Sequence, residues 1–209
     1  MPGPLSGVVL AGGSSRRLGV DKATLTFDGR TLLEIVAERV SAVCVEVIVA
    51  CGSRSIEQWR GAPVRFVADA IPGQGPLAGL QAGLTAAREE FALVVACDMP
   101  FLSPRLLGYM AALPRRYDAL VPLVDGRWHP AHAIYARACL PVIEELLAQG
   151  GNKMEDLIDR LRVQPLSEDE VRRSDPETLS LFNLNTRRDL ARARALWQTQ
   201  VAGLGVGSQ

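Results

Sequence analysis

The 209-residue chain has no excess of charge of either sign, because 23 Lys and Arg residues balance 23 Asp and Glu residues. A broad basic surface that binds nucleic acid non-specifically therefore has no support in the composition, and no nucleic-acid partner is expected. A small anionic ligand is compatible with a neutral chain, because such a ligand needs only a local positive site.

Long apolar runs are also missing. No stretch reaches the roughly 18 to 20 consecutive apolar residues that cross a bilayer. Residues 1–6 lack the basic start and the apolar stretch of a secretory signal. We therefore expect a cytoplasmic protein without a membrane partner.

Cysteine and histidine are scarce, with four and two residues. The cysteines are Cys44, Cys51, Cys97 and Cys139, and they form neither a C-x-x-C pair nor a zinc-finger spacing. This scatter favours reduced, buried thiols. His129 and His132 are too few for a zinc site made by protein alone, and their odd spacing places them on opposite faces of an extended segment.

The chain does contain short apolar runs that alternate with segments of helical period, which is typical of βαβ units. The runs predict strands at residues 7–11, 45–50, 64–68, 93–96 and 119–124, and the Asp125-Gly126 pair predicts a hairpin within 124–135. Helices are predicted at 31–43, 77–90, 104–113, 137–149, 153–161 and 186–200. The polar stretch 165–178 is predicted to be a loop or a linker into a last strand at 179–184.

These elements predict a single Rossmann-like, three-layer α/β domain over residues 1–200. Its central sheet is expected to be mostly parallel, with a small β-hairpin/helix insertion. Residues 201–209 contain three glycines and are expected to form a flexible tail.

A glycine-rich segment directly follows the first predicted strand. Residues 10–22 read Leu-Ala-Gly-Gly-Ser-Ser-Arg-Arg-Leu-Gly-Val-Asp-Lys. Gly12, Gly13 and Gly19 permit positive φ and a close approach of backbone N–H groups to a polyphosphate. Arg17 and Lys22 could neutralise phosphate charge. The spacing matches neither a Walker A loop nor a dinucleotide fingerprint, and an ordinary turn with solvated arginines is the alternative on spacing alone.

Two aspartates follow predicted strands. Asp98 stands at the carboxyl end of a predicted central strand, where open α/β sheets bind ligands, and a carboxylate there suits Mg²⁺. Asp69 follows another strand. The alternative for each is a residue that caps a turn before a proline. Gly79 and Gly83 lie on one helical face, which also fits tight packing of a helix on a sheet.

Taken together, these motifs resemble the molybdenum cofactor guanylyltransferases of the molybdopterin nucleotidyltransferase family. The resemblance is carried by Leu10-Ala11-Gly12-Gly13, Ser15, Arg17, Gly19, Asp21-Lys22, Asp69, residues 75–79 and 97–101, His129-Pro130 and residues 183–186. It covers roughly residues 8–196. Leu18 stands where the family has Met, a change that conserves volume. The family often has Asn where this chain reads Ala50-Cys51-Gly52, so no base contact is carried over to that segment.

The resemblance implies a role for specific residues. The implied catalytic residues are Arg17, Lys22 and Asp98, and Asp98 would bind Mg²⁺. The implied nucleotide site comprises Leu10, Ala11, Gly12, Gly13, Lys22, Asp69, Gly75, Pro76, Leu77, Gly79 and Asp98. The implied molybdopterin site comprises His129, Pro130, Asn185 and Thr186.

The resemblance also implies the reaction, which is transfer of GMP from GTP to the terminal phosphate of molybdopterin with release of pyrophosphate. Expected partners are the two substrates and, transiently, molybdenum cofactor synthesis proteins and recipient molybdoenzymes. Three alternatives remain open, namely a cytidylyltransferase acting on the same cofactor, a sugar-phosphate nucleotidyltransferase and a noncatalytic cofactor carrier. Lys22 together with Asp98 argues against the carrier, which needs no triphosphate and metal pair.

Overall fold

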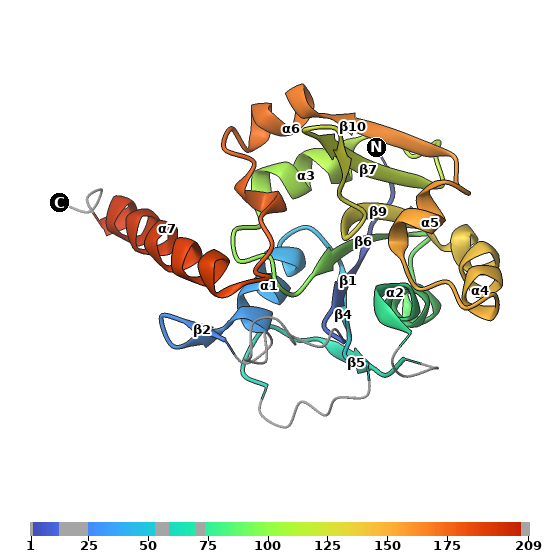
Figure 1. The fold of residues 1–209 in the computed structure, drawn as a ribbon, viewed down its shortest axis with the longest axis horizontal. Helices are drawn as coiled ribbons and strands as arrows, with labels where there is room; N and C mark the ends of the chain where they lie inside the picture. The colour runs from blue at the N-terminus through green and yellow to red at the C-terminus, as the bar shows by residue number, and fades with distance from the viewer. Residues whose placement is uncertain (1, 13–24, 53–58, 70–73, 206–209) are drawn as a thin grey trace.

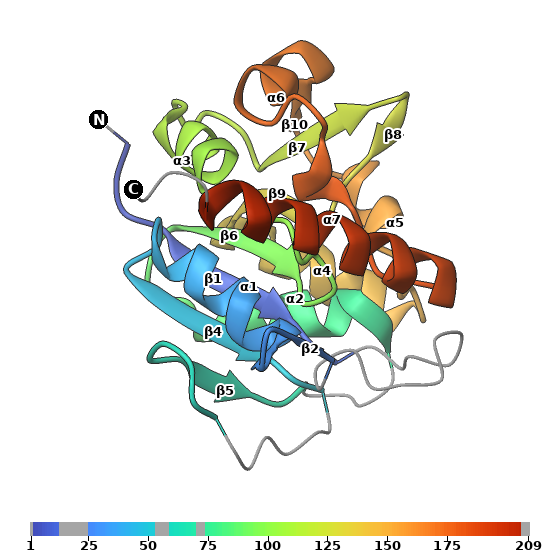
Figure 2. The ribbon, with the colours of Figure 1, turned by 90° about the vertical axis from the view of Figure 1, so that its left-hand side faces the viewer.

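The computed structural model describes residues 2–12, 25–52, 59–69 and 74–205. This part of the chain forms three layers, in which helices cover both faces of one central sheet (Figures 1 and 2). No helix within these ranges is both long and apolar enough to span a membrane. The predicted three-layer α/β fold is confirmed.

The central sheet has the strand order β10-β7-β9-β6-β1-β4-β5, and β8 pairs with β7. The strands are β1 Ser6–Leu10, β4 Glu46–Ala50, β5 Arg65–Val67, β6 Phe91–Ala96, β7 Ala119–Val124, β8 Arg127–Trp128, β9 His132–Ala136 and β10 Val163–Ser167. β9 is antiparallel to β6 and β7, and β8 is antiparallel to β7, whereas the other pairs are parallel. Leu10 lies opposite both Ala50 and Ala96, so the carboxyl ends of β1, β4 and β6 meet at one edge.

Helices α1 (Leu32–Ser41) and α3 (Pro104–Ala112) cover one face of the sheet, the face that Figure 2 turns toward the viewer. Helices α2 (Gly75–Ala86), α4 (Leu140–Ala148) and α5 (Met154–Ile158) cover the other face. Thr31 and Glu34 form a capping box at the start of α1, and the Ser103 side chain caps α3. Caps of this kind each stabilise a protein by about 1 kcal/mol, so local sequence fixes where these helices begin.

A small hairpin stands apart from the central sheet. It consists of β2 (Thr26–Phe27) and β3 (Arg30–Thr31), which pair antiparallel. The two turn residues have positive φ, 49° at Asp28 and 76° at Gly29. An Asp-Gly pair with positive φ at both positions is the preferred two-residue turn of a hairpin, because its twist matches that of the strands.

The core explains the apolar runs of the sequence. Val8, Val9 and Leu93 are completely buried because both faces of the sheet are covered. Gly83 lets α2 approach β1 closely, since a Cβ there would lie 2.3 Å from Val8 Cγ1. The predicted tight contact between the helix and the sheet is therefore present at Gly83.

The segment 165–184 was predicted incorrectly. Residues Val163–Ser167 form β10 and Glu168–Ser174 form α6, where a loop or linker was expected. Leu179–Leu181 form a short 3₁₀ helix instead of a last strand. The prediction failed because β10 is an edge strand, whose polar side chains face water and hide the apolar alternation.

Two helix ends differ from the predicted position by more than three residues. Helix α2 stops at Ala86 instead of residue 90, and α7 (Arg187–Gly205) continues beyond residue 200.

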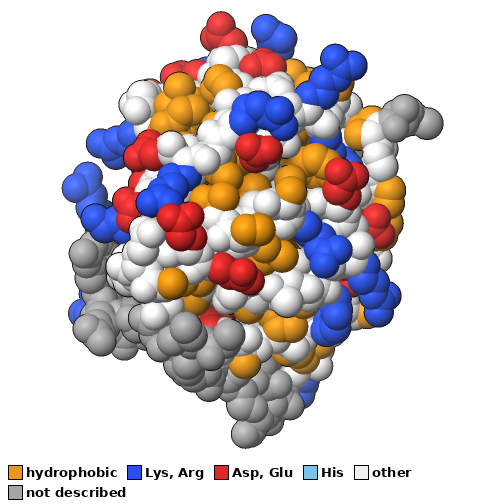
Figure 3. Space-filling view, turned by 90° about the vertical axis from the view of Figure 1, so that its right-hand side faces the viewer, with side chains coloured by type: hydrophobic (Ala, Val, Ile, Leu, Met, Phe, Trp, Pro, Cys, Tyr) orange, Lys and Arg blue, Asp and Glu red, His pale blue; other side chains and the backbone are white. Residues whose placement is uncertain are grey.

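On the face shown in Figure 3, basic and acidic side chains are interspersed with apolar ones. Neither sign of charge dominates that face.

Candidate active site

A cavity of about 250 Å³ lies at the edge where the carboxyl ends of β1, β4 and β6 meet. Its walls also include the start of α2 and the residue that precedes β9. The lining residues are Leu10, Gly12, Ala50, Asp69, Gly75, Pro76, Gly79, Ala96, Cys97, Asp98 and Ala131. Open α/β sheets bind ligands at this edge, so the cavity is the candidate active site.

Backbone hydrogen bonds continue from the strands into the cavity wall. The Ala11 N–H donates to the Ala50 carbonyl at 2.8 Å, and the Cys97 N–H donates to the Leu10 carbonyl at 3.0 Å. On the other side, the Ala96 N–H donates to the Ala131 carbonyl at 2.9 Å. The residues just past each strand are thus held by the sheet, which gives the cavity a rigid floor.

Two glycines bring the loops after β1 and β4 into direct backbone contact. A Cβ on Gly12 would lie 3.1 Å from the Gly52 nitrogen, and a Cβ on Gly52 would lie 3.1 Å from Gly12 Cα. Gly52 also has a φ of +65°, which L side chains rarely adopt. Close approach therefore requires small residues at both positions, independently of any phosphate.

Asp69 presents a carboxylate to this contact. Its Oδ2 lies 3.5 Å from the position of a Cβ on either glycine. Its Oδ1 is buried and has no hydrogen-bond partner among the described residues. Burial raises the pKa of Asp69, opposed by a hydrogen bond from the Gly52 backbone. A buried carboxylate oxygen without a partner is suited to accept a hydrogen bond from a ligand in the cavity.

Asp98 follows β6 and lines the same cavity, half-buried. Its backbone carbonyl accepts a hydrogen bond from the Leu184 N–H at 2.9 Å, which ties it to the segment before α7. Among the described residues, no group of three or more His, Cys, Asp or Glu side chains could hold a metal ion. Mg²⁺ requires only one or two protein carboxylates when phosphate oxygens and water complete its shell, so the donors present fit that ion.

The structure brings most predicted nucleotide-site residues together. Leu10, Gly12, Asp69, Gly75, Pro76, Gly79 and Asp98 all line the cavity. Ala11 and Leu77 are buried in the core and do not line it. Gly13, Arg17 and Lys22 lie outside the described residues.

The cavity wall also contains four residues that were not predicted to belong to the site, although one of them, Cys97, is part of the motif 97–101. They are Ala50, Ala96, Cys97 and Ala131. Small apolar side chains carry no chemical signal of a site. The register of the strands provides one, because Ala50 and Ala96 flank Leu10 in the sheet.

The predicted molybdopterin residues do not line the cavity but lie next to residues of its wall. Pro130 precedes the lining residue Ala131 in the chain, and its carbonyl accepts a hydrogen bond from the Tyr135 hydroxyl at 2.8 Å. His129 is half-buried, and burial lowers its pKa. Of the two segments that carry the predicted molybdopterin residues, one precedes Ala131 in the chain and the other follows Leu184, which binds Asp98.

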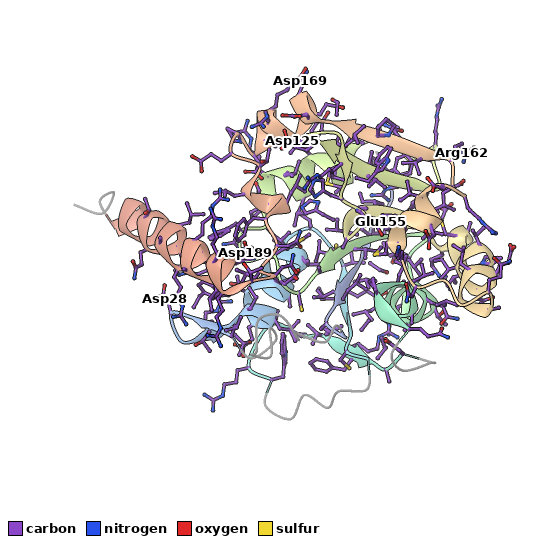
Figure 4. All side chains as sticks on the ribbon, viewed as in Figure 1. Asp28, Asp125, Glu155, Arg162, Asp169 and Asp189 are labelled. Carbon is purple, nitrogen blue, oxygen red and sulfur yellow. The ribbon has the colours of Figure 1, made fainter. Side chains whose placement is uncertain are left out.

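Asn185 and Thr186 are exposed and follow Leu184, whose N–H binds the Asp98 carbonyl. The Thr186 hydroxyl donates to the Asp189 carboxylate at 2.8 Å and accepts from the Asp189 N–H at 3.1 Å. Figure 4 shows Asp189 at the start of α7. Thr186 thus caps the start of α7. Because Leu184, two residues earlier, binds Asp98, this cap fixes the start of α7 relative to Asp98.

His132 has a structural environment distinct from that of His129. It is completely buried, and its Nε2 lies 2.9 Å from the Ser180 Oγ. That hydroxyl also accepts the Ser103 N–H at 3.0 Å, while the Ser180 N–H donates to Asp175 at 2.7 Å. Burial lowers the pKa of His132 to about 4, so the ring is neutral at pH 7.

Comparison with known proteins gives consistent matches over nearly the whole chain. Residues 7–165 match the family model described as MobA-like NTP transferase domain. A protein of Pelotomaculum thermopropionicum named "Probable molybdenum cofactor guanylyltransferase" is 37% identical over 198 residues, 95% of this chain and 96% of that protein. The "Molybdenum cofactor guanylyltransferase" of Desulfosudis oleivorans is 34% identical over 193 residues, 91% of this chain and 95% of that protein.

Among solved structures, the molybdopterin-guanine dinucleotide biosynthesis protein A of Archaeoglobus fulgidus aligns with a TM-score of 0.80 at 29% identity. The alignment covers 93% of this chain and all of that one. A 2-C-methyl-D-erythritol 4-phosphate cytidylyltransferase from Thermus thermophilus aligns with a TM-score of 0.67 at 22% identity and shares the fold. The cavity, its glycines and its two aspartates thus lie in a chain that belongs to the MobA-like NTP transferase family.

Proposed function

We propose that the protein transfers GMP from GTP to the terminal phosphate of molybdopterin, which forms molybdopterin guanine dinucleotide and releases pyrophosphate. The observation that carries this proposal is the convergence of Gly12, Asp69, Gly79 and Asp98 on one cavity. These residues come from four separate segments of the chain, and each belongs to a motif that resembles the family. The relatives are named molybdenum cofactor guanylyltransferases, and these names support a guanylyl group as the group transferred and the molybdenum cofactor as its acceptor.

The reaction needs position and charge more than acid–base chemistry. The acceptor phosphate is already ionised near pH 7, so it can attack the α-phosphorus in line while pyrophosphate leaves, without a covalent intermediate on the enzyme. We assign Gly12 and Gly13 to close backbone approach to the triphosphate. Arg17 and Lys22 neutralise its charge, Arg as a planar fork and Lys as a compact ammonium.

The two aspartates have different roles in this proposal. Asp98 would hold Mg²⁺, which when bound supplies positive charge at the triphosphate oxygens. Asp69, with its buried carboxylate oxygen, accepts a hydrogen bond from a sugar hydroxyl or a base N–H. Gly75, Pro76 and Gly79 bring the start of α2 close to the nucleotide.

The acceptor side lies at the same edge of the sheet. We assign molybdopterin to the segments His129-Pro130 and Asn185-Thr186, because the first precedes Ala131 and the second follows Leu184, whose N–H donates to the Asp98 carbonyl. The proposed product also implies a cytoplasmic enzyme with transient contacts to molybdenum cofactor synthesis proteins and recipient molybdoenzymes. No nucleic acid or membrane takes part in this reaction.

Mass spectrometry of the reaction product tests the proposal. The purified protein is incubated with Mg²⁺, molybdenum-loaded molybdopterin and each of the four nucleoside triphosphates in separate reactions. A dinucleotide product with GTP alone is expected. Product with CTP alone would show that the base is cytosine, and no product with any triphosphate would contradict the proposal and favour a sugar-phosphate acceptor or a carrier.

A further inference from the structure

Helix α7 contacts two segments that lie far apart in the sequence. One is the hairpin β2–β3, and the other is the segment that follows Asp98. Figure 1 shows α7 passing beside β2 and α1, with its first turn near the centre of the molecule. Trp197, on α7, contacts both segments.

The contact with the hairpin combines a hydrogen bond and ring packing. The Trp197 indole N–H donates to the Asp28 carboxylate at 2.6 Å, and the Trp197 ring centroid lies 5.1 Å from that of Phe27. Figure 4 shows Asp28 at the turn of the hairpin, next to α7. The hairpin begins four residues after Lys22 in the chain, and Lys22 is the residue that the proposed function assigns to the triphosphate.

The contact with the Asp98 segment has two parts. The Trp197 ring lies 6.2 Å from Phe101, which is buried and follows Asp98-Met99-Pro100 in the chain. In the segment just before the helix, the Leu184 N–H donates to the Asp98 carbonyl. The helix and the segment that leads into it thus contact the Asp98 segment at two points.

A guanidinium completes the surroundings of the indole. Arg39 of α1 lies with its Cζ 6.0 Å from the Trp197 ring centroid, and its Nη1 donates to the Leu102 carbonyl. Arg39 thus connects Trp197 to the residue after Phe101. A cation over the face of an indole ring is attracted by the ring electrons, so Arg39 stabilises this packing.

We infer that α7 is a positioning element, and that Trp197 is the positioning residue that holds the hairpin β2–β3 at a fixed distance from the Asp98 segment. This inference rests on the proposed function for its chemistry. In-line transfer requires the phosphate ligands and Asp98 in one geometry, and a displacement of 1 Å can reduce a rate about 100-fold. Trp197 itself touches neither substrate nor cavity in this assignment.

The variant Trp197→Phe keeps an aromatic ring and removes the N–H that binds Asp28. The matched control is Trp59→Phe, because Trp59 is also half-buried, donates its indole N–H to the Ala62 carbonyl at 2.8 Å and packs on Phe66. We expect kcat to fall at least about 10-fold in Trp197→Phe with a change of less than about 3-fold in the KM for GTP. The Tm should change by no more than in Trp59→Phe. Equal kcat values in the two variants would overturn the inference, as would a kcat loss that only parallels a loss of Tm.

Hydrogen exchange gives a readout that needs no turnover. Trp197→Phe should increase amide exchange at residues 25–31 and 99–102, and Trp59→Phe should leave those amides protected. Unchanged exchange at both segments in Trp197→Phe would contradict the inference. This measurement separates the two proposals, because a wild-type protein that makes no dinucleotide disproves the proposed function and still shows whether α7 holds the hairpin.

A double-mutant cycle with Asp28→Gly tests the specific pair. Glycine preserves the positive φ of the turn and removes the acceptor for the Trp197 N–H. If the two residues act through each other, the double variant should lose little more kcat than either single variant. Additive losses would show that Trp197 acts without Asp28 and would overturn its assignment as the residue that holds the hairpin.

Discussion

Gly12 and Gly52 touch backbone to backbone, and a Cβ on Gly52 would lie 3.1 Å from the Gly12 Cα. The contact joins the loop after β1 to the loop after β4, beside the Asp69 carboxylate. A glycine that would be attributed to phosphate binding from the sequence is therefore also required by packing. The two requirements can be separated by experiment.

The variant Gly52→Ala should lower the free energy of unfolding by about 1–2 kcal/mol, because an L side chain is strained at the positive φ of this residue. The new Cβ should also displace Gly12. GTP affinity should fall as well, because Gly12 lines the cavity. The matched control is Gly126→Ala, which also has a positive φ, +69°, but has nothing within 4 Å of the new Cβ. Urea unfolding and GTP calorimetry measure both effects, and an equal effect of the two variants on GTP binding would contradict the role of the contact.

The variant Gly83→Ala should destabilise the protein by about 1–3 kcal/mol, because its Cβ would overlap Val8 Cγ1. The control Gly108→Ala lies in α3 with nothing within 4 Å of the new Cβ, and should stabilise the protein by about 0.5–1 kcal/mol. Denaturant titration of both variants checks the prediction. If the double variant Gly83→Ala/Val8→Ala partly recovers the free energy of unfolding that Gly83→Ala loses, the clash with Val8 is confirmed as the cause.

The variant Asp98→Asn should reduce kcat at least about 100-fold, because it removes the charge that would hold the metal ion and leaves the neighbouring backbone intact. GTP binding should persist in part, since the other cavity residues remain. Steady-state kinetics and calorimetry are the measurements. Normal turnover in Asp98→Asn would disprove the metal assignment.

The variant Asp69→Asn should weaken GTP binding without destabilising the fold. Burial raises the pKa of Asp69, so the folded protein binds this proton more tightly than the unfolded chain does. The buried charge consequently disfavours folding above the raised pKa and has no effect below the unfolded value. The free energy of unfolding of Asp69→Asn minus that of the wild type should therefore increase as pH rises. A difference that decreases with pH would contradict this interpretation.

Acid should destabilise the protein through His132. Its pKa is lowered to about 4 in the fold from 6.5, so the unfolded chain binds the proton more tightly. The full stabilisation is present above pH 6.5 and is lost as pH falls toward 4, with a total on the order of 3 kcal/mol. Unfolding of the wild type and of His132→Gln across this window measures the difference, and parallel curves would disprove the assignment.

The sequence predicts most of the sheet, because its strands are buried on both faces and therefore read as short apolar runs. β10 was not predicted, because it is an edge strand with few buried side chains. For α6, the capping box formed by Ser167 and Glu170 is the sequence signal that was missed. Within the site, the aspartates and glycines could be predicted from the sequence because their residue types indicate ligand binding. Ala50 and Ala96 could not, because only the register of the strands places them in the cavity wall.

The position of α7 could not be predicted for a different reason. Its hydrogen bond from Trp197 to Asp28 joins residues 169 positions apart, and no local pattern encodes such a pair.

That separation has a consequence for how the protein forms. Closing a loop of 169 residues carries an entropic penalty that local contacts do not, so we expect the hairpin to dock on α7 after the sheet has assembled. The contact that we infer to fix the hairpin relative to the Asp98 segment is therefore expected to form among the last steps of folding, and a variant without the Trp197 side chain is expected to keep its sheet.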